Sequence, residues 1–216
     1  VSIIDLFAGA GGIGLGASSA GGTLRLSVEM DPVCCQTLKL NRGMHPGQVF
    51  EGDVSSLTGQ QLRQLAGLGT SDPLMIVGGP PCQPFSKAGY WTDPGNDSRY
   101  RRAKAKGVSI PKPDQIIDAR PDVRRDLVQE FLNRIVEADA DCFLFENVRS
   151  ILHPRNKLVV DKFIERAQSF GFQTTLIIAN AAEYGVPQLR ERVFILGSKH
   201  IKPKEPLKTH NKTNDK

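Results

Sequence analysis

The chain has few cysteines and no long hydrophobic run. Its 216 residues include four cysteines, Cys34, Cys35, Cys82 and Cys142, without the C-x-x-C pairs of a zinc site or the regular spacing of a disulfide framework. This scarcity predicts a reducing, intracellular setting and no bound metal. No stretch approaches the ~20 apolar residues that cross a bilayer, and the first residues lack the pattern of a secretion signal. We therefore expect a cytoplasmic protein without a membrane partner.

The excess of positive charge is small. Lysine and arginine number 28 against 23 aspartates and glutamates, which gives a formal net charge of +5. Such an excess permits a polyanionic partner but is also common on an ordinary solvated surface, so charge alone decides nothing. With 39% hydrophobic residues the chain can bury a substantial core, and its length is typical of a single domain.

Short apolar runs alternate with amphipathic segments along most of the chain. Near-continuous apolar strands joined by helical crossovers predict an α/β fold with a doubly wound, mostly parallel sheet of seven strands. We expect the strands at 3–7, 24–28, 49–50, 74–77, 142–145, 174–178 and 192–196, and the helices at 14–20, 32–41, 58–66, 123–138 and 157–170.

Two segments interrupt this alternation. Residues 92–122 are polar, rich in proline, glycine, arginine and lysine, and longer than an ordinary connection, which predicts a functional loop or a disordered insertion. Residues 199–216 are basic and almost without apolar side chains, which is typical of a linker or a frayed tail. The globular domain is therefore predicted to comprise residues 1–198.

One cysteine follows an apolar strand in an unusually stiff loop. Residues 78–86 read Gly-Gly-Pro-Pro-Cys-Gln-Pro-Phe-Ser, directly after the apolar run 74–77. The prolines restrict the backbone on both sides of Cys82, as a nucleophile requires and a buried packing thiol does not. We therefore predict that Cys82 is a catalytic nucleophile.

A glycine-rich turn joins the first strand to the first helix. Gly9, Gly11 and Gly14 satisfy G-x-G-x-x-G in the strand-turn-helix context of a nucleotide-binding loop. Glu29 ends the second strand, where a carboxylate can accept hydrogen bonds from ribose hydroxyls. Asp53 follows the third strand and could accept a hydrogen bond from an exocyclic amine, although an aspartate there is more often a turn former. The glycine pattern alone fits nicotinamide, flavin and adenosyl cofactors.

Charged residues also mark two of the later strands. Glu146 follows the run 142–145 at the sheet edge that carries Cys82, where burial would raise the pKa of its carboxyl so that it could donate to a ring nitrogen. Arg190 and Arg192 alternate onto one face at the start of the last strand, where a guanidinium could bind a carboxylate and a carbonyl oxygen together. The competing interpretations are a helix-capping glutamate and a solvated strand edge.

In this order, the motifs resemble those of the cytosine-5 DNA methyltransferase family, in its bacterial restriction-modification branch. The resemblance covers nearly all of residues 1–198. It implies the Rossmann-like fold of S-adenosylmethionine-dependent methyltransferases and the transfer of a methyl group to C5 of a flipped-out cytosine in double-stranded DNA. The residues that carry it are 5–12, Glu29, 52–53, 80–83, 146–148 and 188–192.

The resemblance also implies a role for each motif. Cys82 would attack C6 of cytosine, Glu146 would protonate or hydrogen-bond N3, and Arg192, near Arg190, would hold O2 of the base together with Glu146. S-adenosylmethionine, converted to S-adenosylhomocysteine, would contact Phe7, Ala8, Gly9, Ala10, Gly11, Gly12, Glu29, Met30, Asp53, Val54, Pro81 and Leu127. DNA would be contacted by Gln83, Ser86, Lys87, Arg99, Arg101, Arg102, Lys104 and Lys106.

The sequence departs from the family pattern in two places. The segment 92–122 is longer than the usual loop, and no target recognition domain or final Asn-containing segment follows the last motif. We therefore expect a fragment, or one subunit of a split enzyme whose partner or C-terminal segment carries target recognition. In a bacterium the enzyme would be associated with the nucleoid. The alternatives are a tRNA cytosine-5 methyltransferase, a catalytically silent DNA- or partner-binding module, and a nicotinamide dehydrogenase.

Overall fold

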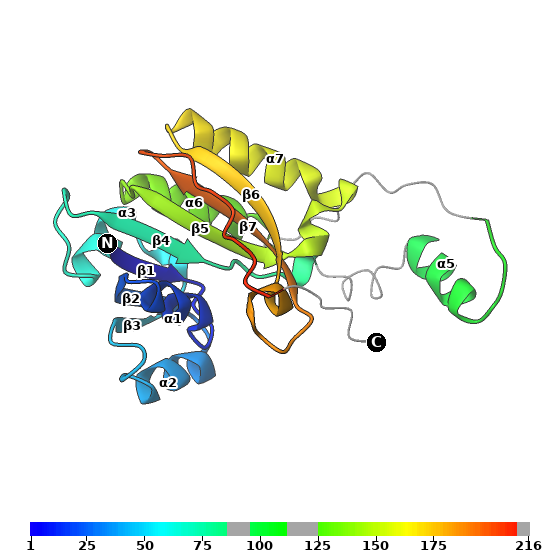
Figure 1. Ribbon diagram of the computed structural model, residues 1–216, viewed down its shortest axis with the longest axis horizontal. Helices are drawn as coiled ribbons and strands as arrows, with labels where there is room; N and C mark the ends of the chain where they lie inside the picture. The colour runs from blue at the N-terminus through cyan, green and yellow to red at the C-terminus, as the bar shows by residue number, and fades with distance from the viewer. Residues whose placement is uncertain (86–95, 112–124, 211–216) are drawn as a thin grey trace.

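A seven-stranded sheet forms the centre of the computed structural model, which describes residues 1–85, 96–111 and 125–210 (Figure 1). The strand order is β3-β2-β1-β4-β5-β7-β6, and β7 alone runs antiparallel to its neighbours. The bounds are β1 Ser2–Leu6, β2 Thr23–Glu29, β3 Gln48–Glu51, β4 Leu74–Gly78, β5 Cys142–Val148, β6 Gln173–Asn180 and β7 Glu191–Ser198.

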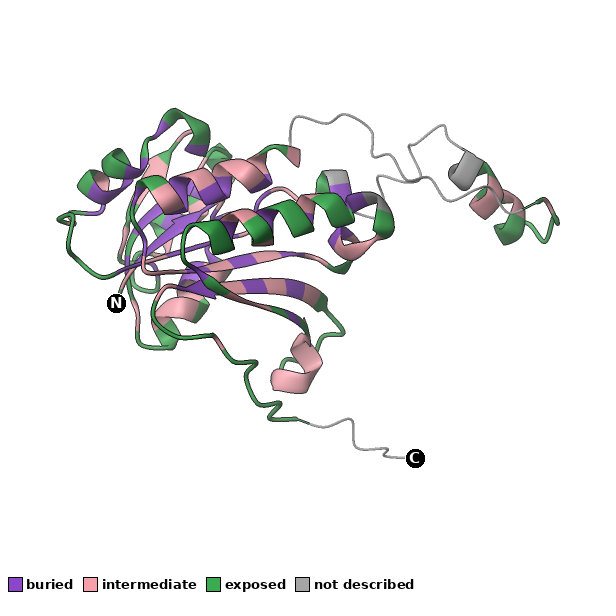
Figure 2. Ribbon diagram, turned by 90° about the horizontal axis from the view of Figure 1, so that it is seen from above, coloured by how far each residue is buried: buried purple, intermediate pink, exposed green. Residues whose placement is uncertain are grey.

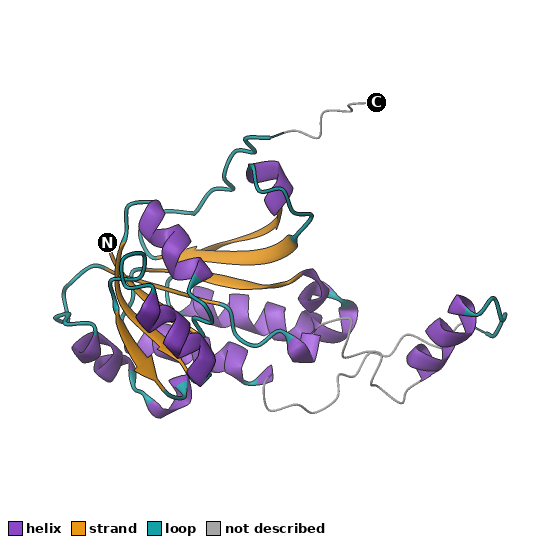
Figure 3. Ribbon diagram, turned by 90° about the horizontal axis from the view of Figure 1, so that it is seen from below, coloured by secondary structure: helices purple, strands orange, loops and turns teal. Residues whose placement is uncertain are grey.

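Helices flank the sheet on both sides. They are α1 Gly12–Ser19, α2 Pro32–Leu40, α3 Gly59–Leu65, α6 Leu127–Glu137 and α7 Pro154–Ser169, while a further helix, α5 Asn96–Ala105, lies apart from the sheet (Figure 1). Figure 3 shows them as separate purple segments around the orange strands. The predicted doubly wound, mostly parallel α/β fold is confirmed, because each apolar run expected to be a strand forms one.

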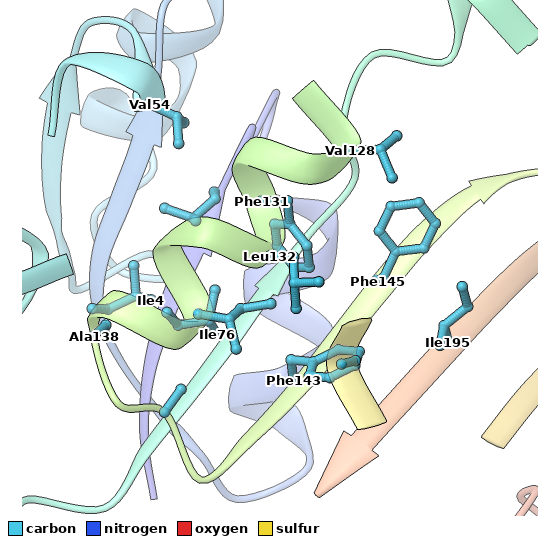
Figure 4. Packing of buried hydrophobic residues seen from close by; sticks show 14 of the residues in the cluster. Ile4, Val54, Ile76, Val128, Phe131, Leu132, Ala138, Phe143, Phe145 and Ile195 are labelled. Atoms are coloured by element: carbon cyan, nitrogen blue, oxygen red, sulfur yellow. The ribbon is translucent and has the colours of Figure 1, made fainter. Parts of the chain in front are cut away.

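The larger core lies between the sheet and the helices α6 and α7. Phe131, Phe143, Phe145 and Phe163 are fully buried there (Figure 4), and the rings of Phe145 and Phe163 have centroids 5.0 Å apart. Tilted and edge-to-face ring pairs of this kind add to the free energy gained by burying their large apolar surfaces. This core fixes β4 and β5, the strands that lead to Cys82 and Glu146.

A smaller core lies between the sheet and α1. Ile3, Leu24 and Val77 are buried there against Ile13 and Ala17 of the helix. Burial follows the strands and the inner sides of the helices, as Figure 2 shows by the purple segments. The loop at the N-terminus of α1 is thus held against β1 and β2.

The helix ends follow from local sequence. Asp31 caps α2 by accepting hydrogen bonds from the amides of Val33 and Cys34, with Pro32 in the first turn. Thr58 and Gln61 form a capping box at the start of α3. Gly171, at φ +87°, follows the last turn of α7 as a left-handed cap.

Two segments differ in detail from the sequence-based expectation. The strand expected at 3–7 ends at Leu6, because Phe7 turns the chain with a φ of +57°. The helix α5 lies within the expected loop 92–122. Its polar sequence has no apolar periodicity from which a helix could be predicted. No helix in the described part of the chain combines the length and apolarity needed to cross a membrane.

The residues after β7 lie against the sheet. Thr175 of β6 donates from its hydroxyl to the carbonyl of Pro203, 2.6 Å away. Further along, the backbone amide of His210 donates to the carbonyl of Glu183, and Lys208 pairs with the Glu183 carboxylate at 3.0 Å. These contacts bring residues 199–210 back along β6 toward the edge at which β6 ends.

Candidate active site

One pocket lies at the carboxyl ends of the parallel strands, where open α/β sheets bind ligands. Its volume is about 660 Å³, within the usual range for a small-molecule site. Residues from both groups predicted from the sequence line it. From the cofactor group these are Phe7, Glu29, Met30, Asp53, Val54, Pro81 and Leu127, and from the others Cys82, Gln83, Glu146, Arg190 and Arg192.

The glycine-rich loop is held from both ends by carboxylates. At one end, Glu29 Oε2 accepts a hydrogen bond from the Gly9 amide at 2.7 Å. At the other end, Asp5 Oδ2 accepts one from the Gly14 amide at 2.9 Å, inside the first turn of α1. Gly11 has a φ of +88°, and a Cβ there would lie 2.3 Å from the ring of the buried His45. The loop therefore requires glycine at Gly11 for both reasons.

Asp5 is one of the residues of this site whose role the sequence did not reveal. It is fully buried, and burial raises the pKa of its carboxyl from 3.8 to about 7, with the nearby Glu29 charge adding to the rise and the Gly14 amide opposing it. Its Oδ1 has no hydrogen-bond partner within the described chain. The sequence feature that could have indicated this role is a single aspartate inside an otherwise apolar strand.

Glu29 and Asp53 both combine a backbone contact with a place in the pocket wall. Glu29 Oε1 accepts hydrogen bonds from the amides of Met30 and Asp31, both at 2.8 Å. Asp53 accepts one from the Ser55 amide at 2.8 Å and so caps a short 3-10 helix. The turn-forming interpretation of Asp53 and its place in the pocket are therefore compatible.

The loop of Cys82 is tied to the neighbouring strand. The side chain of Asn147, fully buried in β5, donates to the Pro80 carbonyl at 3.1 Å, while its oxygen accepts from the Val148 amide. Phe85 anchors the loop on the other side in the core. Sequence reasoning assigned no role to Asn147, because its partner lies 67 residues earlier in the chain.

Glu146 and Arg192 form an ion pair in the pocket wall. Arg192 Nε lies 2.8 Å from Glu146 Oε1, and the two side chains are 19% and 23% exposed, with the arginine the more exposed of the two. The antiparallel register of β5 and β7 places Val148 opposite Arg192, which brings the two charged side chains onto the same face. Arg190 lines the pocket just before β7 and is exposed.

The remaining predicted residues lie outside the pocket wall or outside the described chain. Residues 8–12 form the loop beside the pocket. Arg99, Arg101 and Arg102 lie on α5, apart from the sheet (Figure 1). Ser86 and Lys87 lie outside the described residues. In the described part of the chain, no cluster of three or more potential ligand side chains could hold a metal ion.

The ordered motifs and the pocket agree with a comparison to known protein families. The profile of the C-5 cytosine-specific DNA methylase family matches residues 1–101 and 118–216. The chain belongs to this family. Residues 102–117 are the part that the family profile leaves out, and they begin within α5.

Two curated relatives show how much of a longer protein the chain spans. It is 34% identical to the type II methyltransferase M.AquIA of Picosynechococcus sp., with 98% of this chain and 78% of the relative covered. It is 33% identical to the type II methyltransferase M.XorII of Xanthomonas oryzae pv. oryzae, covering 91% of this chain but 40% of the relative. The chain thus spans less than half of some family members.

Solved structures show the same fold. A prophage-encoded protein of E. coli, described as a DNA modification methyltransferase, superimposes with a TM-score of 0.68 and 26% identity, over 92% of this chain and 47% of its own. The Dnmt2 methyltransferase of S. pombe superimposes with a TM-score of 0.59 over 95% of this chain and 51% of its own. At 16% identity, the second likeness concerns the fold alone.

Proposed function

We propose that the chain transfers a methyl group from S-adenosylmethionine to C5 of a flipped-out cytosine in double-stranded DNA, through a covalent adduct with Cys82. The observation that carries this proposal is the convergence of Cys82, Glu146 and Arg192 on a single pocket. Cys82 lies in the loop after β4, Glu146 lies in β5 and Arg192 lies in β7, so the three side chains are far apart in sequence. Membership of the cytosine-5 family supports the assignment.

The residues of the pocket fit an adenosyl cofactor. Glu29 would accept hydrogen bonds from the ribose hydroxyls, Asp53 would accept one from the adenine amine, and Phe7 would lie against the adenine ring. The amides of the glycine loop are partly engaged by Asp5 and Glu29, which holds the loop in place before a ligand arrives. The cofactor supplies an electrophilic methyl group on a sulfonium. No metal takes part in this proposal.

The chemistry begins with the thiolate of Cys82. Its sulfur forms a bond to C6 of the base, while Glu146 stabilises the added charge at N3 by a hydrogen bond or a proton. The electron pair displaced onto C5 would then form the bond to the methyl carbon, whose bond to the sulfonium breaks with its electron pair left on sulfur, so that S-adenosylhomocysteine leaves. Loss of the C5 proton to a base restores the ring double bond and expels the Cys82 sulfur.

Arg192 has a double task in this scheme. Its guanidinium already holds Glu146 through Nε, which fixes the carboxyl in the pocket wall. Its Nη1 donates to the Glu191 carbonyl at 2.8 Å, and the N–H groups that remain are suited to O2 of the base. Arg192 would therefore orient Glu146 and the base relative to each other, and Arg190 would line the entrance beside it.

Duplex DNA and a further protein segment complete the proposal. The named relatives are type II methyltransferases, which favours DNA over tRNA, and base rotation out of a duplex costs roughly a few kcal/mol that binding must supply. Because the chain spans 40% of M.XorII, we propose that a C-terminal segment or a second subunit supplies target recognition. In a bacterial cell the complex would act at the nucleoid.

Methyl transfer to defined substrates tests this function. Wild-type protein, alone and with the product of the neighbouring coding segment, is given labelled S-adenosylmethionine with duplex DNA or tRNA. We expect label in DNA with the wild type and none with Cys82→Ala. The control Cys142→Ala, at the end of β5 opposite Glu146, should have normal activity. Label in tRNA alone, or full activity of Cys82→Ala, would overturn the proposal.

A further inference from the structure

The helix α5 concentrates positive charge. Five of the eight residues from 99 to 106 are basic, and no acidic residue occurs between 98 and 113. The charged side chains at Arg99, Arg102, Lys104 and Lys106 are exposed. Like charges this close repel one another, so the helix is suited to a partner that neutralises them.

The end of this helix is encoded locally. Gly107 adopts a φ of +71°, and the amide of Val108 donates to the carbonyl of Ala103 at 2.9 Å while that of Gly107 donates to Lys104 at 3.1 Å. This is the Schellman arrangement that ends many helices. Basic side chains in the last turn also interact favourably with the negative end of the helix dipole.

Apolar packing does not account for α5. Its sequence has no apolar stripe, and Figures 1 to 3 show it apart from the sheet and from the helices that cover the sheet. An isolated helix shorter than about 12 residues is marginal in water, so a bound polyanion would add to its stability. The lack of an apolar stripe also argues against a membrane surface, which such a helix would have to enter.

The helix follows the Cys82 loop in sequence, and its last residues lie outside the part of the chain that the family profile matches. The profile leaves out residues 102–117. It also lies on the side of the molecule to which the parallel strands point (Figure 1). This placement is on the side of the pocket that a DNA duplex would approach.

We propose that α5 is an arm that binds the phosphate backbone of duplex DNA outside the base-binding pocket, independently of sequence. The choice of duplex DNA rests on the proposed function. Arg99 and Arg102 lie three residues apart on one side of the helix, and Lys106 directly follows its last residue, so the basic run from 99 to 106 is about 10 Å long at 1.5 Å per residue. A duplex offers several phosphates over this length, because it carries one charge per ~1.7 Å of axis.

Salt-dependent binding tests the arm in the full chain. The variant Arg99→Gln/Lys104→Gln/Lys106→Gln removes three charges from α5 and the residue that follows it, and Lys162→Gln/Lys202→Gln/Lys204→Gln removes three charges from α7 and the tail. For the α5 variant we expect affinity for a random duplex to fall on the order of 10- to 100-fold at 0.1 M salt, and the slope of log K against log salt to lessen by about 2 to 3. We expect the matched control to change that slope by less than about 1.

Three results would overturn the arm: equal slopes for the two variants, tighter binding of structured RNA than of duplex DNA, or charge-dependent binding to anionic vesicles instead. S-adenosylhomocysteine affinity should be the same in all proteins, which excludes misfolding of the variants. Because the assay involves no methyl transfer, its outcome is separate from that of the Cys82→Ala test. If the methylation assay failed but the two variants still differed in slope, DNA binding by α5 would be supported and the proposed methyl transfer would be contradicted.

Discussion

The two halves of the pocket are held together in different ways. In the cofactor half, the carboxylates of Asp5 and Glu29 bind backbone amides of a loop that lies directly after β1. In the catalytic half, Cys82 comes from the loop after β4, whereas Glu146 and Arg192 come from β5 and β7. An ion pair and the buried amide of Asn147 link these elements. The first half is therefore built mainly by local sequence, and the second depends on the topology of the whole sheet.

The largest expected effect is a loss of methyl transfer on substitution in the catalytic half, with cofactor binding in the other half unchanged. Glu146→Gln keeps the shape of the side chain but removes the charge that pairs with Arg192 and the proton exchange at N3. We expect the rate of methyl transfer to fall by about 10²- to 10⁴-fold, with unchanged affinity for S-adenosylhomocysteine. Single-turnover kinetics and calorimetry measure the two quantities.

The control for that prediction is a neighbouring glutamate. Glu191 pairs with Arg149 at the exposed start of β7 at 2.7 Å, so Glu191→Gln should change the rate by less than about 3-fold. If the Glu146→Gln protein kept the wild-type rate, the proposed role of Glu146 at N3 would be contradicted.

The next effect concerns the cofactor half alone. In Gly11→Ala the new methyl group would meet the His45 ring at 2.3 Å, whereas in Gly9→Ala it would find nothing within 4 Å, although both positions have positive φ. We expect losses of unfolding free energy of about 2–5 kcal/mol for Gly11→Ala and about 1–2 kcal/mol for Gly9→Ala. Denaturant titration measures both. Equal losses would show that the packing beneath the loop is not tight.

A smaller effect tests the link across the catalytic half. Asn147→Ala leaves the buried Pro80 carbonyl without its donor, and we expect the protein to lose about 1–3 kcal/mol of unfolding free energy. Under conditions where the variant is folded, formation of the Cys82 adduct should slow while S-adenosylhomocysteine still binds. Equal loss of cofactor affinity would mean that the two halves are not independent.

A further effect is a dependence of stability on pH that comes from Asp5. With the folded pKa raised from 3.8 to about 7, the folded state binds the proton more tightly than the unfolded state. The Asp5 contribution to stability is therefore most favourable below the unfolded pKa and is lost as the pH rises through the folded one, with a slope of at most roughly 1.4 kcal/mol for each tenfold fall in proton concentration. Unfolding of the wild type and Asp5→Asn, followed from acid to mildly alkaline pH, should show this falling difference. A difference independent of pH would contradict it.

Sequence predicted the fold well because its elements have strong local signals. Near-continuous apolar runs such as 74–77 and 142–145 identify buried parallel strands without further information. The helix α5 was missed for the opposite reason, since its only signals are helix-forming residues and Gly107 after its end. The kink at Phe7 moved one strand boundary by a residue, and periodicity does not report a positive φ.

The sequence predicted those residues of the candidate site that belong to recognisable motifs. Most of the residues expected to bind cofactor and base line one pocket, because consecutive crossovers bring strand ends to the same edge of the sheet. Asp5, His45 and Asn147 were not assigned roles beforehand. Asp5 binds the Gly14 amide across the glycine-rich loop, the His45 ring lies against Gly11, and Asn147 binds the Pro80 carbonyl 67 residues earlier, and such pairings appear only once the chain is folded.

The covalent step at Cys82 is tested most directly by trapping it. In a duplex with 5-fluorocytosine at the target, fluorine replaces the C5 proton whose loss would release the enzyme, so the adduct persists. Incubated with S-adenosylmethionine and any required partner segment, the protein should yield a denaturation-resistant complex whose cross-linked peptide maps to Cys82. Methyl transfer without a trapped complex, or a cross-link mapped to another residue, would contradict the mechanism.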